Sequence, residues 1–297
     1  RTRRRESMGV STRINVEKES SRGMYRPGTG SEDFLKPFET ALLCLGVDYL
    51  DILSLHSVMS AEEAVYPPAL EFFEKVKKEG RTKFTGVSVH GYEPDVIRAV
   101  TDCCVYDVIF VSYNFKQRHR DEIRKAIAYA AGAGLGVIAM KTQAGAFLDR
   151  ARTKPGNHRA GVKWVLNDKN VHTAIPGIRN IEQMKVYLSV MNDLELTPAE
   201  KADLASARCS EGLYCMQCGS CRGQCPRDME IPEYMRAYMY AYGYRDPGKA
   251  RETILDIAPA CAGCGDCTVS CAMGFDIRDR ILDIARVRDV PKDFLTV

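Results

Sequence analysis

Eight cysteines in the last third of the chain have a spacing that suits iron–sulfur chemistry. They form two runs, Cys215-x-x-Cys218-x-x-Cys221-x-x-x-Cys225 and Cys261-x-x-Cys264-x-x-Cys267-x-x-x-Cys271, and proline follows only the first. In this spacing, three thiolates of a run converge on one cubane, and the fourth ligates the other cubane. The runs therefore predict two 4Fe–4S clusters, one held by Cys215, Cys218, Cys221 and Cys271 and the other by Cys261, Cys264, Cys267 and Cys225.

Zinc binding and a disulfide framework are the alternatives for these cysteines. A structural zinc site takes four ligands, usually as two separated pairs, which does not explain the fourth cysteine of each run. A disulfide framework needs an oxidising compartment. The remaining cysteines, Cys44, Cys103, Cys104 and Cys209, suit reduced thiols, and we expect a cytoplasmic protein.

The link between the two runs has helical periodicity. Tyrosines and methionines recur at helical spacing from Tyr234 to Tyr242, and Asp246-Pro247 is typical of a helix start. These features predict a small helical ferredoxin module. We expect these tyrosines and methionines to pack around the clusters, and an electron route through them is the alternative.

Composition excludes some functional classes. The chain has 297 residues, of which 45% are hydrophobic and 27% charged, as in ordinary globular proteins. A net charge of +3 is too small to indicate a nucleic-acid partner, and the sequence has no apolar run that could span a bilayer. We expect a large domain at residues 1–207 and a small one at residues 208–297.

The first two thirds of the chain alternate between short apolar segments and amphipathic ones. The pattern predicts strands near residues 50–55, 84–89, 108–113 and 136–140. It predicts helices near residues 69–79, 93–101, 121–131 and 158–166, and a capping box at Thr197 and Glu200 opens another. Such alternation implies a parallel sheet covered by helices, for which a doubly wound sheet and a barrel are both candidates.

Five segments in order resemble the aldo/keto reductases. They are LGVDYLDILSLH (45–56), KKEGR running into TGVS (77–88), VSYN (111–114), VIAMK (137–141) and AIPGIRN (174–180). The resemblance implies an α/β fold, a TIM-type (β/α)8 barrel with its active site at the carboxyl ends of the strands. It also implies hydride transfer between a nicotinamide and a carbonyl, and one branch of the family carries a C-terminal helical two-cluster domain.

The match begins at the third strand of that family. The first two βα units have no counterpart here, so we expect a longer natural protein or an incomplete barrel. The resemblance implies that His56 orients the substrate carbonyl, although a histidine packed at a strand end is the alternative. Arg13 takes the place of the family lysine, and an arginine does not relay a proton. The proton-donating tyrosine is missing, and Tyr25 lies in the wrong loop to replace it.

The resemblance also implies a nicotinamide dinucleotide, NAD(H) or NADP(H), as cofactor. The matching positions for its contacts are Ser88, Lys141, Gly177, Arg179 and Gln183. Gly177 and Gln183 stand where the family has the cations that hold the 2′-phosphate, so selectivity for that phosphate is expected to be weak. Arg179 is equally compatible with a solvated loop charge.

Two functions remain open. The first is an iron–sulfur oxidoreductase that couples its clusters to carbonyl, alcohol or nicotinamide chemistry on a small-molecule substrate. The second is an electron-transfer subunit of a larger redox complex, in which a degenerate barrel serves as scaffold for a redox partner protein. The incomplete catalytic set favours the second, and the retained His56 favours the first.

Overall fold

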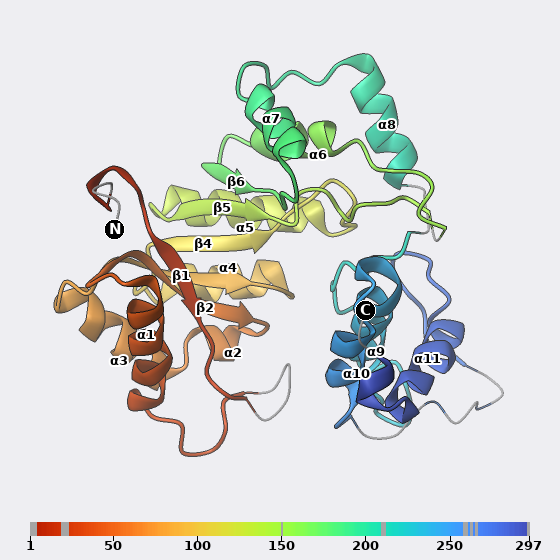
Figure 1. The fold of residues 1–297 in the computed structure, drawn as a ribbon, viewed down its shortest axis with the longest axis horizontal. Helices are drawn as coiled ribbons and strands as arrows, with labels where there is room; N and C mark the ends of the chain where they lie inside the picture. Colours follow the sequence, from red (N-terminus) through yellow and green to blue (C-terminus); the bar gives the residue numbers. More distant parts are fainter. Residues whose placement is uncertain are drawn as a thin grey trace. The chain divides into compact units, whose positions relative to one another are not determined.

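The computed structural model describes residues 5–18, 24–149, 151–208, 212–257, 261, 264 and 267–295 (Figure 1). Backbone contacts divide the chain into two compact units. Unit 1 consists of Arg1–Tyr113, Asp121–Met140 and Asp168–Ile175, and unit 2 of Asn114–Arg120, Lys141–Asn167 and Pro176–Val297. The sequence-based boundary at residues 207 and 208 stays a prediction.

Unit 1 contains a curled parallel sheet. Among the described residues it has six strands, β1 (Ser11–Ile14), β2 (Leu50–Val58), β3 (Thr82–Val89), β4 (Val108–Ser112), β5 (Gly136–Met140) and β6 (Thr173–Ile175). Each strand pairs in parallel with the next one in the sequence. A doubly wound sheet reverses its strand order at a switch point. The sequential order therefore confirms the barrel-type sheet, here as a partial barrel.

One face of this sheet forms the core of unit 1. Leu55, Val87, Ile109 and Val137 lie side by side in the strand register and are at most 1% exposed. Helices flank the strands, and α3 and α4 contact β3 and β4. Their bounds are α1 (Glu32–Leu45), α2 (Ala61–Ala64), α3 (Pro67–Lys78), α4 (Glu93–Asp102) and α5 (Arg120–Gly132), with a 3-10 turn η1 at Arg5–Ser7.

Small residues allow the strands to curl on the opposite face. Arg13, Ser54, Gly86 and Val108 form a row across β1 to β4. A Cβ atom at Gly86 would lie 2.9 Å from both the Ser54 Oγ and the Val108 carbonyl oxygen. Glycine inside a strand often marks such a close approach of two backbones. The absence of a side chain at Gly86 therefore allows β3 to lie close to its neighbouring strands in the curled sheet.

Unit 2 is mainly helical. Its helices are α6 (His158–Leu166), α7 (Ile181–Val190), α8 (Pro198–Arg208), α9 (Ile231–Tyr238), α10 (Pro247–Ile254) and α11 (Ile277–Ala285). A π-helix, η2 (Met239–Tyr244), continues α9, and two 3-10 turns, η3 (Arg286–Asp289) and η4 (Lys292–Phe294), follow α11. No helix within the described ranges is both long and apolar enough to cross a membrane.

Two predicted helix starts in unit 2 are confirmed. Glu200 N–H donates to the Thr197 hydroxyl at 3.2 Å, and Thr197 N–H donates to the Glu200 carboxylate at 2.9 Å, which is a complete capping box. The Asp246 carboxylate accepts from Lys249 N–H at 2.8 Å and caps α10. Helix α9 packs against α10 and α11, and its Ile231, Tyr234 and Tyr238 are buried.

Candidate functional site

The first candidate site lies at the carboxyl end of β2, where the sheet is irregular. The pairing of β2 with β3 shifts between Leu55 and Val58, and Ser57 has a left-handed φ of 59°. A bulge of this kind redirects a side chain, and left-handed backbone outside glycine is often found at functional sites. His56 is the residue that this irregularity positions. Its Nδ1 lies 2.8 Å from the Asn15 Oδ1, directly after β1.

A second histidine completes a group that we call the strand-end site, made of Asn15, His56, Ser88 and His90. The His90 and His56 rings meet edge to face with their centroids 5.3 Å apart. The His90 Nδ1 is 3.1 Å from the buried Ser88 Oγ. All four residues lie at the carboxyl ends of β1, β2 and β3, the end at which barrel enzymes bind their substrates.

Sequence reasoning missed Asn15 and His90. Both directly follow a strand, and a polar side chain at that place was the available signal. Arg13, the replacement for the family lysine, lies on β1 with its guanidinium carbon 5.5 Å from the centroid of the Phe110 ring. Its charge therefore lies on the same face of the curled sheet as Ser54 and Gly86.

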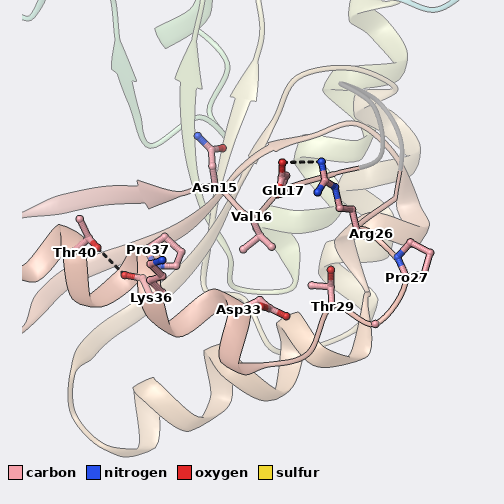
Figure 2. Close-up of a pocket in the computed structure, with 11 residues that line it drawn as sticks. Asn15, Val16, Glu17, Arg26, Pro27, Thr29, Asp33, Lys36, Pro37 and Thr40 are labelled. Atoms are coloured by element: carbon pink, nitrogen blue, oxygen red, sulfur yellow. Dashed lines mark hydrogen bonds and ion pairs between the residues drawn. The ribbon is translucent and has the colours of Figure 1, made fainter. Parts of the chain in front are cut away.

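A cavity of about 660 Å³ lies beside Asn15 (Figure 2). Its walls are the loop after β1 and one side of α1, from which Asp33 and Lys36 contribute side chains. The Arg26 guanidinium is 2.8 Å from the Glu17 carboxylate within it. Charges of both signs line this cavity, and it shares Asn15 with the strand-end site.

Tyr25 is buried near an ion pair of Lys18 and Glu63. The Lys18 Nζ is 5.9 Å from the Tyr25 ring centroid. Burial, reinforced by the Glu63 charge, raises the pKa of Tyr25 far above its usual range. A phenol that holds its proton this tightly is a poor general acid. The environment of Tyr25 is consistent with the expectation that it does not replace the missing tyrosine.

The residues predicted to contact nicotinamide are distributed over both units. Ser88 belongs to unit 1, and the other four belong to unit 2. In the loop before α7, Arg179 N–H donates to the Gln183 Oε1 at 2.8 Å, and Gln183 N–H donates to the Asn180 Oδ1 at 2.9 Å. These bonds bring Arg179 and Gln183 together beside Gly177, where a Cβ would meet open space.

Lys141 directly follows β5 and has a left-handed φ of 55°. Its carbonyl oxygen accepts a hydrogen bond of 3.2 Å from the Asn114 Nδ2. The side chain is exposed.

All eight predicted cluster ligands lie among the described residues, and each is outside a disulfide. Burial raises the pKa of Cys215 to about 12, and repulsion from Cys221, Cys218 and Cys271 contributes to the rise. Ser270 N–H donates to the Gln224 Oε1 at 2.7 Å, so Cys271 lies near the first run, as crossed ligation requires. Within the described part of the chain, no three histidine, cysteine or acidic side chains converge on a single metal ion.

The second run also borders open space. A cavity of about 560 Å³ lies between Cys267 and the start of α11, with Phe275 and Arg278 in its wall. Soft thiolates are the ligands that iron–sulfur clusters take, and Cys267 of the second run lies beside this cavity. The donor set thus fits the clusters, and the individual ligand assignments stay predictions.

Known protein families match two separate parts of the chain. The model of the aldo/keto reductase family matches residues 1–162, and that of a 4Fe-4S dicluster domain matches residues 214–276. The holo form of an aldo-keto reductase from Bacillus halodurans has a TM-score of 0.52 to this chain and 19% identity, covering 69% of this chain and 74% of that one. At this identity the likeness shows the fold alone.

A curated relative resembles a shorter stretch of the chain. One subunit of the ferredoxin:CoB-CoM heterodisulfide reductase of Methanosarcina mazei is 34% identical over 85 residues, which are 28% of this chain and 49% of that relative. The match thus spans about half of the length of that relative. The strand order, the strand-end site and a family match over residues 1–162 of 297 lead to one conclusion: the chain belongs to the aldo/keto reductase family, and it carries a 4Fe-4S dicluster domain toward its C-terminal end.

Proposed function

We propose that the protein is an iron–sulfur oxidoreductase of the aldo/keto reductase type. In this proposal two 4Fe–4S clusters exchange electrons with a small-molecule substrate at the carboxyl ends of the barrel strands. The observation that carries the proposal is the presence, in one chain, of eight cysteines in cluster spacing outside disulfides and of His56 held near the end of β2. A cytoplasmic location belongs to the same proposal.

The strand-end site provides orientation and polarity rather than a strong acid. Asn15 orients the ring of His56, so that the ring is pre-organised toward a substrate oxygen. Arg13 supplies a permanent positive charge that stabilises a developing oxyanion, but its guanidinium does not release a proton. We therefore expect very slow reduction of simple aldehydes, because a positioned general acid contributes about 10²–10⁴-fold.

A nicotinamide dinucleotide is part of the proposal, with Lys141 and Arg179 as the cations for its phosphates. Bound nicotinamide supplies hydride, a two-electron unit, whereas a cubane cluster passes one electron at a time. The substrate must then accept single electrons, or a partner protein must divide the pair. In the second case, a redox partner protein is part of the proposed function.

The second candidate is an electron-transfer subunit of a larger redox complex. The similarity to one subunit of a ferredoxin:CoB-CoM heterodisulfide reductase favours it. Here the partial barrel is a scaffold that docks the cluster domain, and the strand-end site has no substrate. Both candidates use the same clusters and differ in whether the chain binds a nicotinamide and a substrate.

An anaerobic titration of the cluster-loaded chain with NADH and NADPH distinguishes the two candidates. Electron paramagnetic resonance reports cluster reduction, and aldehyde turnover is measured in the same samples. Binding of either nucleotide supports the enzyme. Glu71→Ala, an exposed substitution on α3, is the control. If aldehyde turnover falls in His56→Ala but not in Glu71→Ala, the turnover belongs to the strand-end site. If the clusters are intact but the chain neither binds a nucleotide nor reduces an aldehyde, the result supports the electron-transfer subunit.

A further inference from the structure

Two cations in unit 2 approach the residue that precedes the first cysteine run. Lys116 is only 4% exposed, and its Nζ lies 2.9 Å from the position that a Cβ would take at Gly212. Gly212 has a left-handed φ of 65°, so glycine both permits the turn and leaves room for the ammonium group. Arg280 donates from Nη2 to the Gly212 carbonyl oxygen at 3.0 Å. We call Lys116 and Arg280 the cation pair.

Aromatic rings hold the guanidinium of Arg280 in place. Its central carbon lies 3.8 Å from the ring centroid of Phe275 and 4.7 Å from that of Tyr238. Phe275 follows Cys271 by four residues, and Gly212 precedes Cys215 by three. Arg280 therefore contacts the stretches next to Cys215 and Cys271, the first and last members of one predicted ligand set.

Chain length limits how far the cation pair can be from that ligand set. Three extended residues span at most about 11 Å, and four at most about 14 Å. Over such distances in a protein interior, a charge changes the energy of another charge appreciably. Burial lowers the pKa of Lys116 to about 8, and repulsion from Arg280 contributes. Both side chains are positively charged, so both attract a nearby anion.

A cubane bound by four thiolates is such an anion, and its negative charge grows when it accepts an electron. Cluster net charge and its surroundings set the reduction potential. We propose that the cation pair raises the reduction potential of the cluster held by Cys215, Cys218, Cys221 and Cys271 above that of the other cluster, so that electrons collect there. The inference rests on the proposed cluster assignment. The step is a one-electron reduction by an external donor, in which no bond forms or breaks.

The test is an anaerobic redox titration of the full cluster-loaded chain, followed by electron paramagnetic resonance with dithionite as reductant. In Lys116→Met we expect one cluster to become harder to reduce. Its ratio of reduced to oxidised form at a fixed potential should fall by about threefold to tenfold, where tenfold corresponds to 59 mV for a one-electron couple. Lys116→Arg should keep the wild-type potential, because it keeps the charge.

Lys249→Met is the matched control, since it removes one exposed lysine charge from α10 in the same unit. We expect it to leave both potentials unchanged. Lys116→Gln is the second neutral variant, with a polar side chain that fits the turn in case methionine disturbs it. A role limited to holding the Gly212 turn would lower the thermal stability in Lys116→Met and leave the potentials alone, and that result would overturn the inference.

Iron and sulfide analysis separates this inference from the proposed function. A wild-type chain that binds far fewer than about eight iron atoms would reject both. Full iron content with unshifted potentials in Lys116→Met and Lys116→Gln would reject the inference alone. Equal shifts of both clusters would also overturn it, because the cation pair is placed beside one ligand set.

Discussion

The curled sheet of unit 1 and the cysteine-rich part of unit 2 are stabilised in different ways. In unit 1, helices α1, α3, α4 and α5 have 10 to 14 residues, and rows of fully buried aliphatic side chains connect the strands. In unit 2, helices α9, α10 and α11 have only 8 or 9 residues and alternate with stretches that carry the thiols. Helices this short are marginal by themselves.

The difference shows which interactions each region depends on. We expect the sheet of unit 1, with its rows of buried apolar side chains, to be stable without a ligand. The cysteine-rich part gains order when its thiolates bind, because ligation free energy becomes folding free energy. The functional groups follow the same division, with oriented polar groups at strand ends in unit 1 and the two cysteine runs in unit 2. The two regions should therefore respond differently to substitution.

The largest effect is expected from removing one ligand of a cluster. Cys271→Ser should lose about four of eight iron atoms, and the lost signal should belong to the cluster held by Cys215, Cys218 and Cys221. The C-terminal helices should become sensitive to protease while unit 1 stays resistant. Iron analysis, electron paramagnetic resonance and limited proteolysis measure these changes.

Cys225→Ser is the matched variant, because it should affect the other cluster. If each serine instead disturbed the cluster of its own run, crossed ligation would be wrong. If unit 1 became protease-sensitive together with the C-terminal helices, the two regions would not differ as described.

A smaller but still large effect is expected in the core of unit 1. Phe73 on α3 is fully buried and meets the rings of Phe72 and Tyr106. Phe73→Ala should lower the free energy of unfolding by about 3–5 kcal/mol, since a large cavity replaces the ring. Urea unfolding followed by circular dichroism measures this, and iron content should stay at the wild-type level.

Phe84→Ala is the control for that change, because Phe84 on β3 is 49% exposed. We expect it to cost roughly 0.5 kcal/mol or less. The core of unit 1 is expected to be stable independently of the clusters. Comparable destabilisation by both substitutions, or loss of iron in Phe73→Ala, would contradict this expectation.

Asp51 at the start of β2 makes the stability of unit 1 dependent on pH. Its carboxylate accepts hydrogen bonds from Lys83 at 2.9 Å, from Val10 N–H at 2.7 Å and from Arg5 at 2.6 Å. The bond to Lys83 and the others hold the pKa of Asp51 far below its usual range. A lowered folded-state pKa means that this stabilisation is present above the unfolded pKa of about 3.9 and is lost as the pH falls toward the folded value.

Asp51→Asn should therefore cost about 1 kcal/mol at pH 7, a value that allows for the partial exposure of its cationic partners. The difference from wild type should persist down to about pH 4 and shrink below it. Urea unfolding at several pH values measures it, with the exposed Glu74→Gln on α3 as control. A difference that grew toward low pH would reject the assigned sign.

The smallest effect concerns the choice of nicotinamide dinucleotide. Because Gly177 and Gln183 provide no cation, the dissociation constants of NADH and NADPH should differ by less than about tenfold. Gln183→Arg restores one charge beside Arg179 and should strengthen binding of the 2′-phosphate by about 0.2–1 kcal/mol, as expected for an exposed ion pair. A strong preference of the wild type for NADPH would show that other cations hold the phosphate.

Local signals in the sequence were sufficient for much of the architecture. The predicted strand at residues 136–140 and helix at residues 158–166 coincide with β5 and α6. The Thr197 and Glu200 capping box was readable because both partners lie within one turn. The cysteine spacing likewise carries its own chemistry, since three thiolates of one run are close in the sequence. These features depend on neighbours within a few residues.

Features that depend on distant partners were not predictable in this way. Helix α11 was missed, and its Ile277, Ile281 and Ile284 are buried in the core around α9. The pairing of Asn15 with His56 depends on the register of β1 with β2, and the bulge at Ser57 has no local sequence signal. Only the folded chain brings Ser270 and the neighbouring Cys271 to Gln224 of the first run, and Lys116 and Arg280 to Gly212. Composition and spacing determined which chemistry is available, whereas strand register and helix packing decided which residues meet, because such contacts depend on free energy summed over the whole fold.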